Sequence, residues 1–293
     1  MPENALTLAP EARDEMVKAK VTCPFLGSLV HQELLGVRGA SGNPLAGIEH
    51  VRQLGNEGGG DLGDLLVFFA TGNHAFMRGS SGLALDAPVP AGLFSLELPG
   101  SQGSHPGHSG ILQGDPTQLA SGRLSRDDFA RLAAFAIDGI LKRSDVGRFI
   151  ARNLRKDQNS KVALSKVAAL LGLDLAGIVE AISTNVVSRV FASEADPNNR
   201  QLEQKLTKLL GDDNLVGSCG EFGLLFAFLS NDPETAKRDG EPALSLGHVQ
   251  SMFIQKELPP GWQTWKKSRV DWVLHTTALL LSAAAEYHRL APN

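Results

Sequence analysis

The chain has 293 residues, of which 42% are apolar and 20% charged, and its formal net charge is −4. The weak negative charge argues against a nucleic-acid-binding surface and against a polybasic membrane surface, so the expected partner is a small molecule. This length can bury a substantial core, and without an internal repeat or a clean linker we expect one domain over residues 1–293.

The cysteine pattern and the N-terminal sequence indicate an intracellular setting. Cys23 and Cys219 are far apart and make neither a metal-type pair nor a disulfide framework. Residues 1–20 lack the apolar stretch of a secretory signal, and no run of about eighteen apolar residues indicates a membrane span. We therefore expect a soluble, cytoplasmic protein, or a secreted one if a signal peptide has been removed.

Near the N-terminus, the pattern predicts a charged helix over residues 10–20 and an amphipathic helix over 24–35 that begins with proline. Cys23 would then lie at a helix N-terminus, where free N–H groups and the helix dipole favour the thiolate. A thiolate is a candidate metal ligand, and an inert buried thiol is the alternative.

The next segments combine core and loop patterns. A short helix is expected over residues 44–54, and 62–77 has the apolar density of a core element, in which His74 is either a functional group or a packing residue. Residues 79–122 are rich in Gly, Ser and Pro and predict a long loop. In this loop, His105, His108 and the turn at 113–115 are candidates for lining a site, and solvent-exposed histidines are the alternative.

From residue 125 the sequence is predicted to be almost entirely helical. A Ser-Arg-Asp-Asp start caps a periodic run that extends to residue 140. Further helices are expected over 145–154, 162–171, 175–192, 199–210, 214–229, 245–257 and 268–290. Without convincing strand alternation an all-α fold follows, with a short hairpin in the loop region as the main exception. We expect Trp262, Trp265 and Trp272 to pack internally.

One carboxyl group lies on an apolar stripe. On the predicted helix 214–229, Glu221 shares its face with Gly217, Leu224, Leu225 and Phe228. Burial raises the pKa of a carboxyl group toward neutrality, which suits proton transfer. A salt bridge or a solvent-exposed helix end are the alternatives.

Several stretches occur in an order that resembles a known family. They are Cys23-Pro24 followed by an apolar helix, Gly220-Glu221 on a late apolar helix, a Glu-Leu-Pro-Pro-Gly-Trp turn at 257–262, and Leu-Ser-Arg-Asp-Asp at 124–128. This arrangement is similar to that of the haem-thiolate peroxidases, which include chloroperoxidase and the fungal unspecific peroxygenases. The resemblance covers most of the chain and implies a multi-helix, chloroperoxidase-like fold.

The resemblance also implies a cofactor and a reaction. Haem b would be held by the Cys23 thiolate beside Pro24, with His108 and Phe222 near the cofactor. Glu221 would be the distal acid–base that helps hydrogen peroxide generate a ferryl oxidant, which then oxidises a small organic substrate. A non-catalytic haem or small-ligand binding protein and an all-α interaction protein without a cofactor are the alternatives.

The sequence departs from the family pattern at three places. Thr22 precedes Cys23 where the family usually has proline, and Asn214 stands where the peroxygenase branch has arginine. Gln113 replaces the first glutamate of the family's magnesium-binding motif, leaving Gln113 and Asp115 as candidate magnesium ligands. Because the Gln113 side chain offers a neutral oxygen without a charge, this change weakens the prediction of a magnesium ion.

Overall fold

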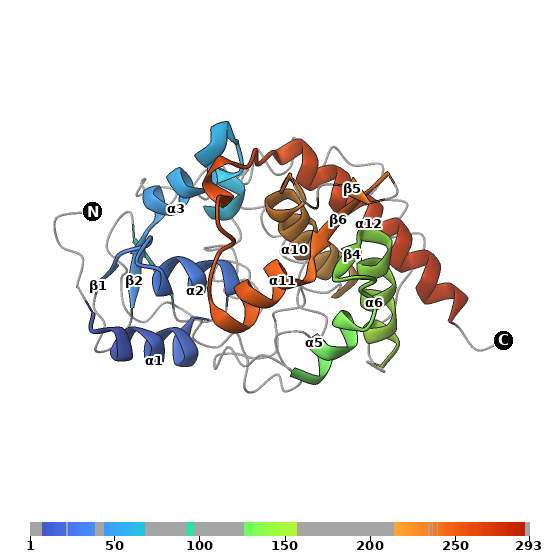
Figure 1. Cartoon of the computed structure of the whole chain (residues 1–293), viewed down its shortest axis with the longest axis horizontal. Coiled ribbons are helices and arrows are strands. Elements are labelled where there is room, and N and C mark those ends of the chain that lie inside the picture. Colours follow the sequence, from blue (N-terminus) through green and yellow to red (C-terminus); the bar gives the residue numbers. More distant parts are fainter. Residues whose placement is uncertain are drawn as a thin grey trace, which may run out of the picture.

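The computed structural model describes residues 8–21, 23–38, 44–67, 93–96, 126–156, 214–233, 235, 237–238 and 240–290. Within these ranges the chain is mostly helical (Figure 1). The main helices are α1 (Pro10–Lys20), α2 (Pro24–His31), α3 (Ile48–Gly55), α5 (Arg126–Ala133), α6 (Arg143–Lys156), α10 (Asn214–Leu229), α11 (Leu246–Gln250) and α12 (Arg269–Arg289). Short helical turns are η1 (Glu57–Gly59), η4 (Ser251–Gln255) and η5 (Trp262–Thr264). No helix in the described ranges has the length and apolar character to cross a membrane.

Two small antiparallel sheets qualify the prediction of an all-α fold. One contains β1 (Val37–Arg38), β2 (Leu45–Gly47) and β3 (Leu93–Ser95) in that order, and the other has the order β4 (Ile140–Lys142), β6 (Glu241–Ser245), β5 (Lys237–Arg238). Leu141 and Leu244 are register partners, and both are buried. The second sheet is therefore anchored in the core, although strands of this length carry too few residues to show alternation.

Left-handed residues end several predicted helices early. The helix expected over 24–35 ends at His31 because Glu33 has a positive φ of 61°. The run expected to reach residue 140 ends at Ala133, and Asp138 with Gly139 then turns the chain into β4. The helix expected over 245–257 is split into α11 and the π-helical η4, and it ends where Lys256 has a φ of 62°.

The other predicted helices agree with the structure to different extents. Predictions over 10–20 and 214–229 match α1 and α10, and those over 145–154 and 268–290 match α6 and α12 to within two residues. The prediction over 44–54 is partly wrong, because β2 occupies its first turn and α3 begins at Ile48. Residues 63–67 are helical and buried at Leu65, Leu66 and Val67, as expected of core. The predictions over 162–171, 175–192 and 199–210 lie outside the described residues.

Helices α6, α10 and α12 pack together in the C-terminal half (Figure 1). Glycines permit the close approach: a Cβ at Gly223 of α10 would overlap Thr276 of α12, and one at Gly147 of α6 would overlap Ser282 of α12. The Trp272 indole N–H also donates to the Gly220 carbonyl oxygen at 2.9 Å. These contacts fix α10, the helix that carries Glu221.

A buried lysine connects the loop before α12 to the N-terminal half. Lys267 is fully buried, and its Nζ donates to the carbonyl oxygens of Glu57 and Trp265 at 3.1 and 3.0 Å. The ammonium also lies 5.5 Å from the ring centre of Phe228 and 5.1 Å from that of Trp262, within cation–π range. The loop is thereby fixed to both η1 and α10.

His275 connects the three packed helices through polar groups. The Arg143 guanidinium donates to Nδ1 at 3.2 Å, so Nε2 carries the proton and donates to Ser230 Oγ at 3.4 Å. Burial, followed by the positive charge of Arg143, lowers the pKa of His275 to about 4. The folded protein therefore holds this imidazole in its neutral form near neutral pH.

We expect G223A to lower the free energy of unfolding by about 1–3 kcal/mol, because the added methyl group overlaps Thr276 in a closely packed contact. G247A is the matched control, since a Cβ at this exposed helical glycine meets no atom closer than 3.4 Å. Denaturant unfolding measures both variants. Equal stability of G223A and the wild type would contradict the close packing of α10 on α12.

We expect acid to destabilise the fold through His275. An unfolded histidine binds a proton near pH 6.5, whereas the native one does so only near pH 4, so stability falls as the pH drops through this window. The contribution is about 3 kcal/mol. H275Q should reduce the difference in unfolding free energy between pH 7 and pH 4.5, whereas H288Q, at an exposed histidine of the same helix, should preserve it. An unchanged pH dependence in H275Q would refute this role.

Candidate functional site

Cys23 caps the N-terminus of α2, as the sequence predicts. Pro24 begins the helix, and the Gly27 N–H donates to the Cys23 carbonyl oxygen at 2.8 Å. The Cys23 side chain is partly buried, while residues 24–30 are buried. No backbone N–H bonds the Cys23 side chain as a cap, but the nearby N–H groups of Leu26 and Phe25 lower the pKa of the thiol.

The surroundings of Cys23 have opposing effects on its acidity. Burial is the largest influence and raises the pKa of the thiol to about 11. The Glu221 carboxylate also raises the pKa, while the backbone N–H groups of Leu26 and Phe25 and the positive charge of Lys256 lower it. Without a bound cation, the thiol is therefore protonated at neutral pH. A metal that binds the sulfur displaces this proton, as with other thiolate ligands.

Glu221 lies close enough to Cys23 to influence its acidity. Glu221 is half-buried on α10, and its charge acts on the Cys23 sulfur from a distant part of the sequence. Cys219, two residues earlier on the same helix, is fully buried and belongs to the hydrophobic core.

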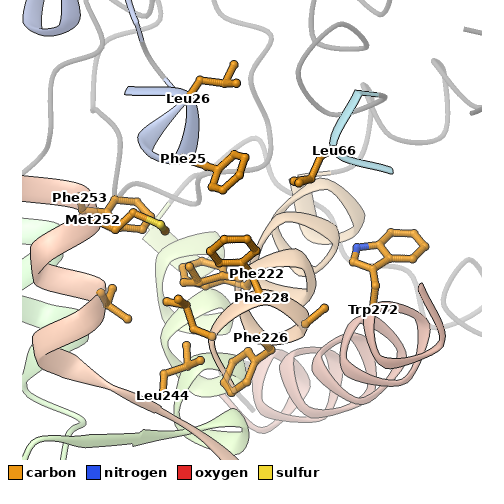
Figure 2. Packing of buried hydrophobic residues seen from close by; sticks show 14 of the residues in the cluster. Phe25, Leu26, Leu66, Phe222, Phe226, Phe228, Leu244, Met252, Phe253 and Trp272 are labelled. Carbon is orange, nitrogen blue, oxygen red and sulfur yellow. The ribbon is translucent and has the colours of Figure 1, made fainter. Parts of the chain in front are cut away.

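An aromatic cluster of Phe25, Phe228 and Trp262 joins the three predicted motifs. The ring centres of Phe25 and Phe228 are 4.8 Å apart in an edge-on arrangement. Trp262 lies 6.4 Å from Phe25 and 5.4 Å from Phe228. Figure 2 shows Phe25 projecting from α2 toward the side chains of α10. The helix that begins at Cys23 and the 257–262 turn therefore meet α10 directly.

The segment from η4 to residue 258 packs along α2. Ser28 Oγ donates to the Pro24 carbonyl oxygen at 2.8 Å and also contacts that of Met252 at 3.4 Å. The Leu258 N–H donates to Gln32 Oε1 at 3.0 Å. These contacts hold the segment against the middle and the C-terminal end of α2.

The other predicted site residues fall into three groups: those found where they were expected, those that pack in the core, and those outside the described residues. Pro24 occupies the first turn of α2, as expected. Phe222 is buried and packs edge-on against Phe149 of α6 at 6.2 Å, so the contact observed for it is within the core. The three C-terminal tryptophans are buried, which confirms their prediction. His74, His105, His108, Gln113, Asp115 and the 124–125 part of the Ser-Arg motif lie outside the described residues.

Lys256 is a site residue that the sequence patterns did not reveal. It acts electrostatically on Cys23, and its aliphatic chain covers Gly27 in the first turns of α2. The sequence does show that Lys256 directly precedes the 257–262 turn. It does not show where the side chain points, because this depends on the left-handed backbone at Lys256.

Cys23 provides one sulfur atom as a possible ligand. Among the described residues, no group of three or more His, Cys, Asp and Glu side chains is arranged to hold a metal. A haem would need only one such protein ligand, because the porphyrin supplies four of the ligands of its iron. Near Cys23, the Phe25 ring packs against Phe228.

Comparison of the chain with protein-family models, with curated proteins and with solved structures found no match.

We expect the Cys23 thiol of haem-free C219A protein to be alkylated about a hundredfold more slowly at pH 8 than an unhindered thiol, because its pKa of about 11 leaves little thiolate. Adding E221Q removes a negative charge and should speed the reaction. The control is E33Q, which changes an exposed carboxylate beyond the end of α2. An alkylation rate unaffected by E221Q would contradict the electrostatic contact between Glu221 and Cys23.

Proposed function

We propose that this protein is a haem-thiolate peroxidase or peroxygenase, which uses hydrogen peroxide to oxidise a small organic substrate. The observation that carries the proposal is the packing of Phe25 on Phe228 at 4.8 Å, which joins the helix that begins at Cys23 to the helix that carries Glu221. The family resemblance assigns iron ligation to Cys23 and acid–base catalysis to Glu221. The aromatic cluster adds the third motif, the 257–262 turn, to the same place. Convergence of three distant motifs supports a shared site.

Cys23 would hold the haem iron through its sulfur. The backbone N–H groups of Leu26 and Phe25, which lower the pKa of the thiol, would help to stabilise the negative charge of the bound sulfur. Pro24 fixes the start of the helix, so Cys23 is held at the first turn of α2. When bound, a haem with a thiolate ligand supplies the electron donation that favours cleavage of the O–O bond of peroxide.

Glu221 would transfer the proton that this cleavage requires. Its carboxylate would accept a proton from one oxygen of hydrogen peroxide and give it to the other, which leaves as water. The group is half-buried and belongs to a helix fixed by α6 and α12, so its position is constrained by packing. Rigid placement of a proton-transfer group is what general acid–base catalysis needs.

A non-catalytic haem or small-ligand binding protein is the second candidate. It is favoured by Asn214, the first residue of α10, where the peroxygenase branch has arginine. The Glu221 carboxyl group, which influences the acidity of Cys23, supports catalysis, because glutamate is one of the side chains that carry out general acid–base catalysis. The two candidates differ in the role of Glu221.

We expect protein from haem-sufficient cells to contain haem, and its reduced carbon-monoxide adduct to have the absorption maximum typical of thiolate ligation. C23S should lose this signature, because serine offers no comparable anionic ligand, while C219A should keep it. Absorption spectra of the purified proteins measure both. A wild-type protein that is colourless and free of haem would refute the proposal.

We expect E221Q to retain its haem and to lose about 10²–10⁴-fold in peroxide-dependent turnover, because glutamine cannot carry the proton. Turnover is measured with a one-electron donor and with an oxygen-accepting substrate, and is normalised to haem content. E33Q serves again as the exposed control. Full activity in E221Q, with haem intact, would favour the non-catalytic candidate.

A further inference from the structure

Helix α12 carries a stripe of exposed apolar side chains. Among the described residues, three of the four large apolar side chains that are half or more exposed belong to this one helix: Val270, Leu274 and Leu281, with 61%, 58% and 50% exposure. Their spacing of four and seven residues places them on a single face. The residues that continue this face are also partly or fully exposed: Thr277, Ala285 and His288. Scattered exposed leucines are ordinary, whereas a continuous apolar stripe indicates a docking surface.

The opposite face of α12 has its partners within the chain. Trp272, His275, Leu279 and Ala283 are buried there. Trp272 bonds α10 and His275 bonds Arg143 of α6. Figure 1 shows α12 along the outer edge of the C-terminal half, next to α6 and α10. The exposed stripe is therefore separate from the face that forms the three-helix packing.

We propose that this stripe is the contact through which two copies of the chain pair about a twofold axis, with their α12 helices antiparallel. A twofold axis brings the same face of each copy together, so the large and small side chains of that face have to be complementary. In an antiparallel register, Leu281 of one copy faces Thr277 of the other, and Leu274 faces Ala285. Each leucine then meets a small residue, as in the packing of knobs into holes between two helices.

Polar groups at the two ends of α12 favour the antiparallel orientation. Arg289 pairs with Glu286 of the same helix, while Asp271 lies in the first turn and His288 in the last. Antiparallel pairing brings the Asp271 carboxylate of one copy to the His288 imidazole of the other, which offers an N–H donor. This orientation also opposes the two helix dipoles. Parallel pairing would instead bring each Asp271 toward its own counterpart, and like charges repel.

The size of the stripe predicts a weak dimer. Helix α12 has 21 residues, so the contact is about 31 Å long at a rise of 1.5 Å per residue. One pair of helix faces lies at the low end of the areas that specific interfaces bury, where complexes are weak or transient. We therefore expect a dissociation constant in the micromolar range.

Sedimentation velocity of the full chain at increasing concentration measures this association. We expect the wild type to change from a one-chain to a two-chain species across the micromolar range. L274E should weaken the association at least tenfold, because pairing would bury an unpaired carboxylate against Ala285. I137E is the matched control and should associate like the wild type, since Ile137 is exposed to a similar extent, 61%, but precedes β4.

A pair of complementary charges tests which residues face each other. T277E and L281K should each weaken self-association, because each places an unpaired charge in the stripe. Mixing the two proteins should restore a dimer, since antiparallel helices bring the new carboxylate of T277E opposite the new ammonium of L281K. Parallel helices would leave both charges unpaired. A mixture that associates no better than either variant alone would therefore refute the antiparallel arrangement.

Three further results would overturn the inference: a wild type that stays monomeric throughout the micromolar range, an L274E protein that associates like the wild type, and an L274E monomer that unfolds at lower denaturant than the I137E monomer. The third would show that the stripe is covered within one chain. The inference is independent of the proposed function. A monomeric protein with the haem-thiolate signature retains the function and refutes the inference, whereas a haem-free dimer does the reverse.

Discussion

The contact between Phe25 and Phe228 is the interaction on which the arrangement of the site depends. Phe25 follows Cys23 by two residues. On α10, Phe228 lies seven residues after Glu221, so Glu221 and Phe228 share one stripe of that helix. Packing the two rings at 4.8 Å therefore directs the Glu221 stripe toward the start of α2. An edge-on aromatic pair stabilises such a contact by about 0.5–1.5 kcal/mol beyond the burial of its area.

The loop from residue 256 to 267 adds the charges that surround this aromatic contact. Lys256 acts on the Cys23 sulfur, and Lys267 lies over Phe228 and Trp262 with its Nζ bonded to two carbonyl oxygens. Burial lowers the pKa of Lys267 to about 8, as expected for an ammonium group removed from water. Burying two ammonium groups in one loop removes them from water, and this loss of hydration costs free energy that apolar packing does not recover. Carbonyl oxygens and aromatic faces offset that cost for Lys267.

The sequence predicts the helices better than their ends. Apolar periodicity identifies α1 and α10 because it reports which face of a helix is buried. It fails at Glu33, Asp138 and Lys256, whose positive φ angles are uncommon outside glycine and depend on tertiary contacts. The two sheets are missed for a similar reason, since strands of two to five residues are stabilised by partners far away in the sequence.

The same distinction explains which parts of the site are predictable. Cys23 and Glu221 are detectable because each is chemically unusual in its local pattern, a thiol at a helix start and a carboxyl on an apolar stripe. Lys256 is an ordinary residue until the fold orients it over Gly27. Phe222 was predicted to lie near the cofactor because it adjoins Glu221 in sequence. Successive residues of a helix are rotated by about 100° around its axis, so Phe222 faces Phe149 of α6 instead. Helix α10 thus uses one stripe for the site and another for the core, so adjacent residues on it affect different properties of the protein.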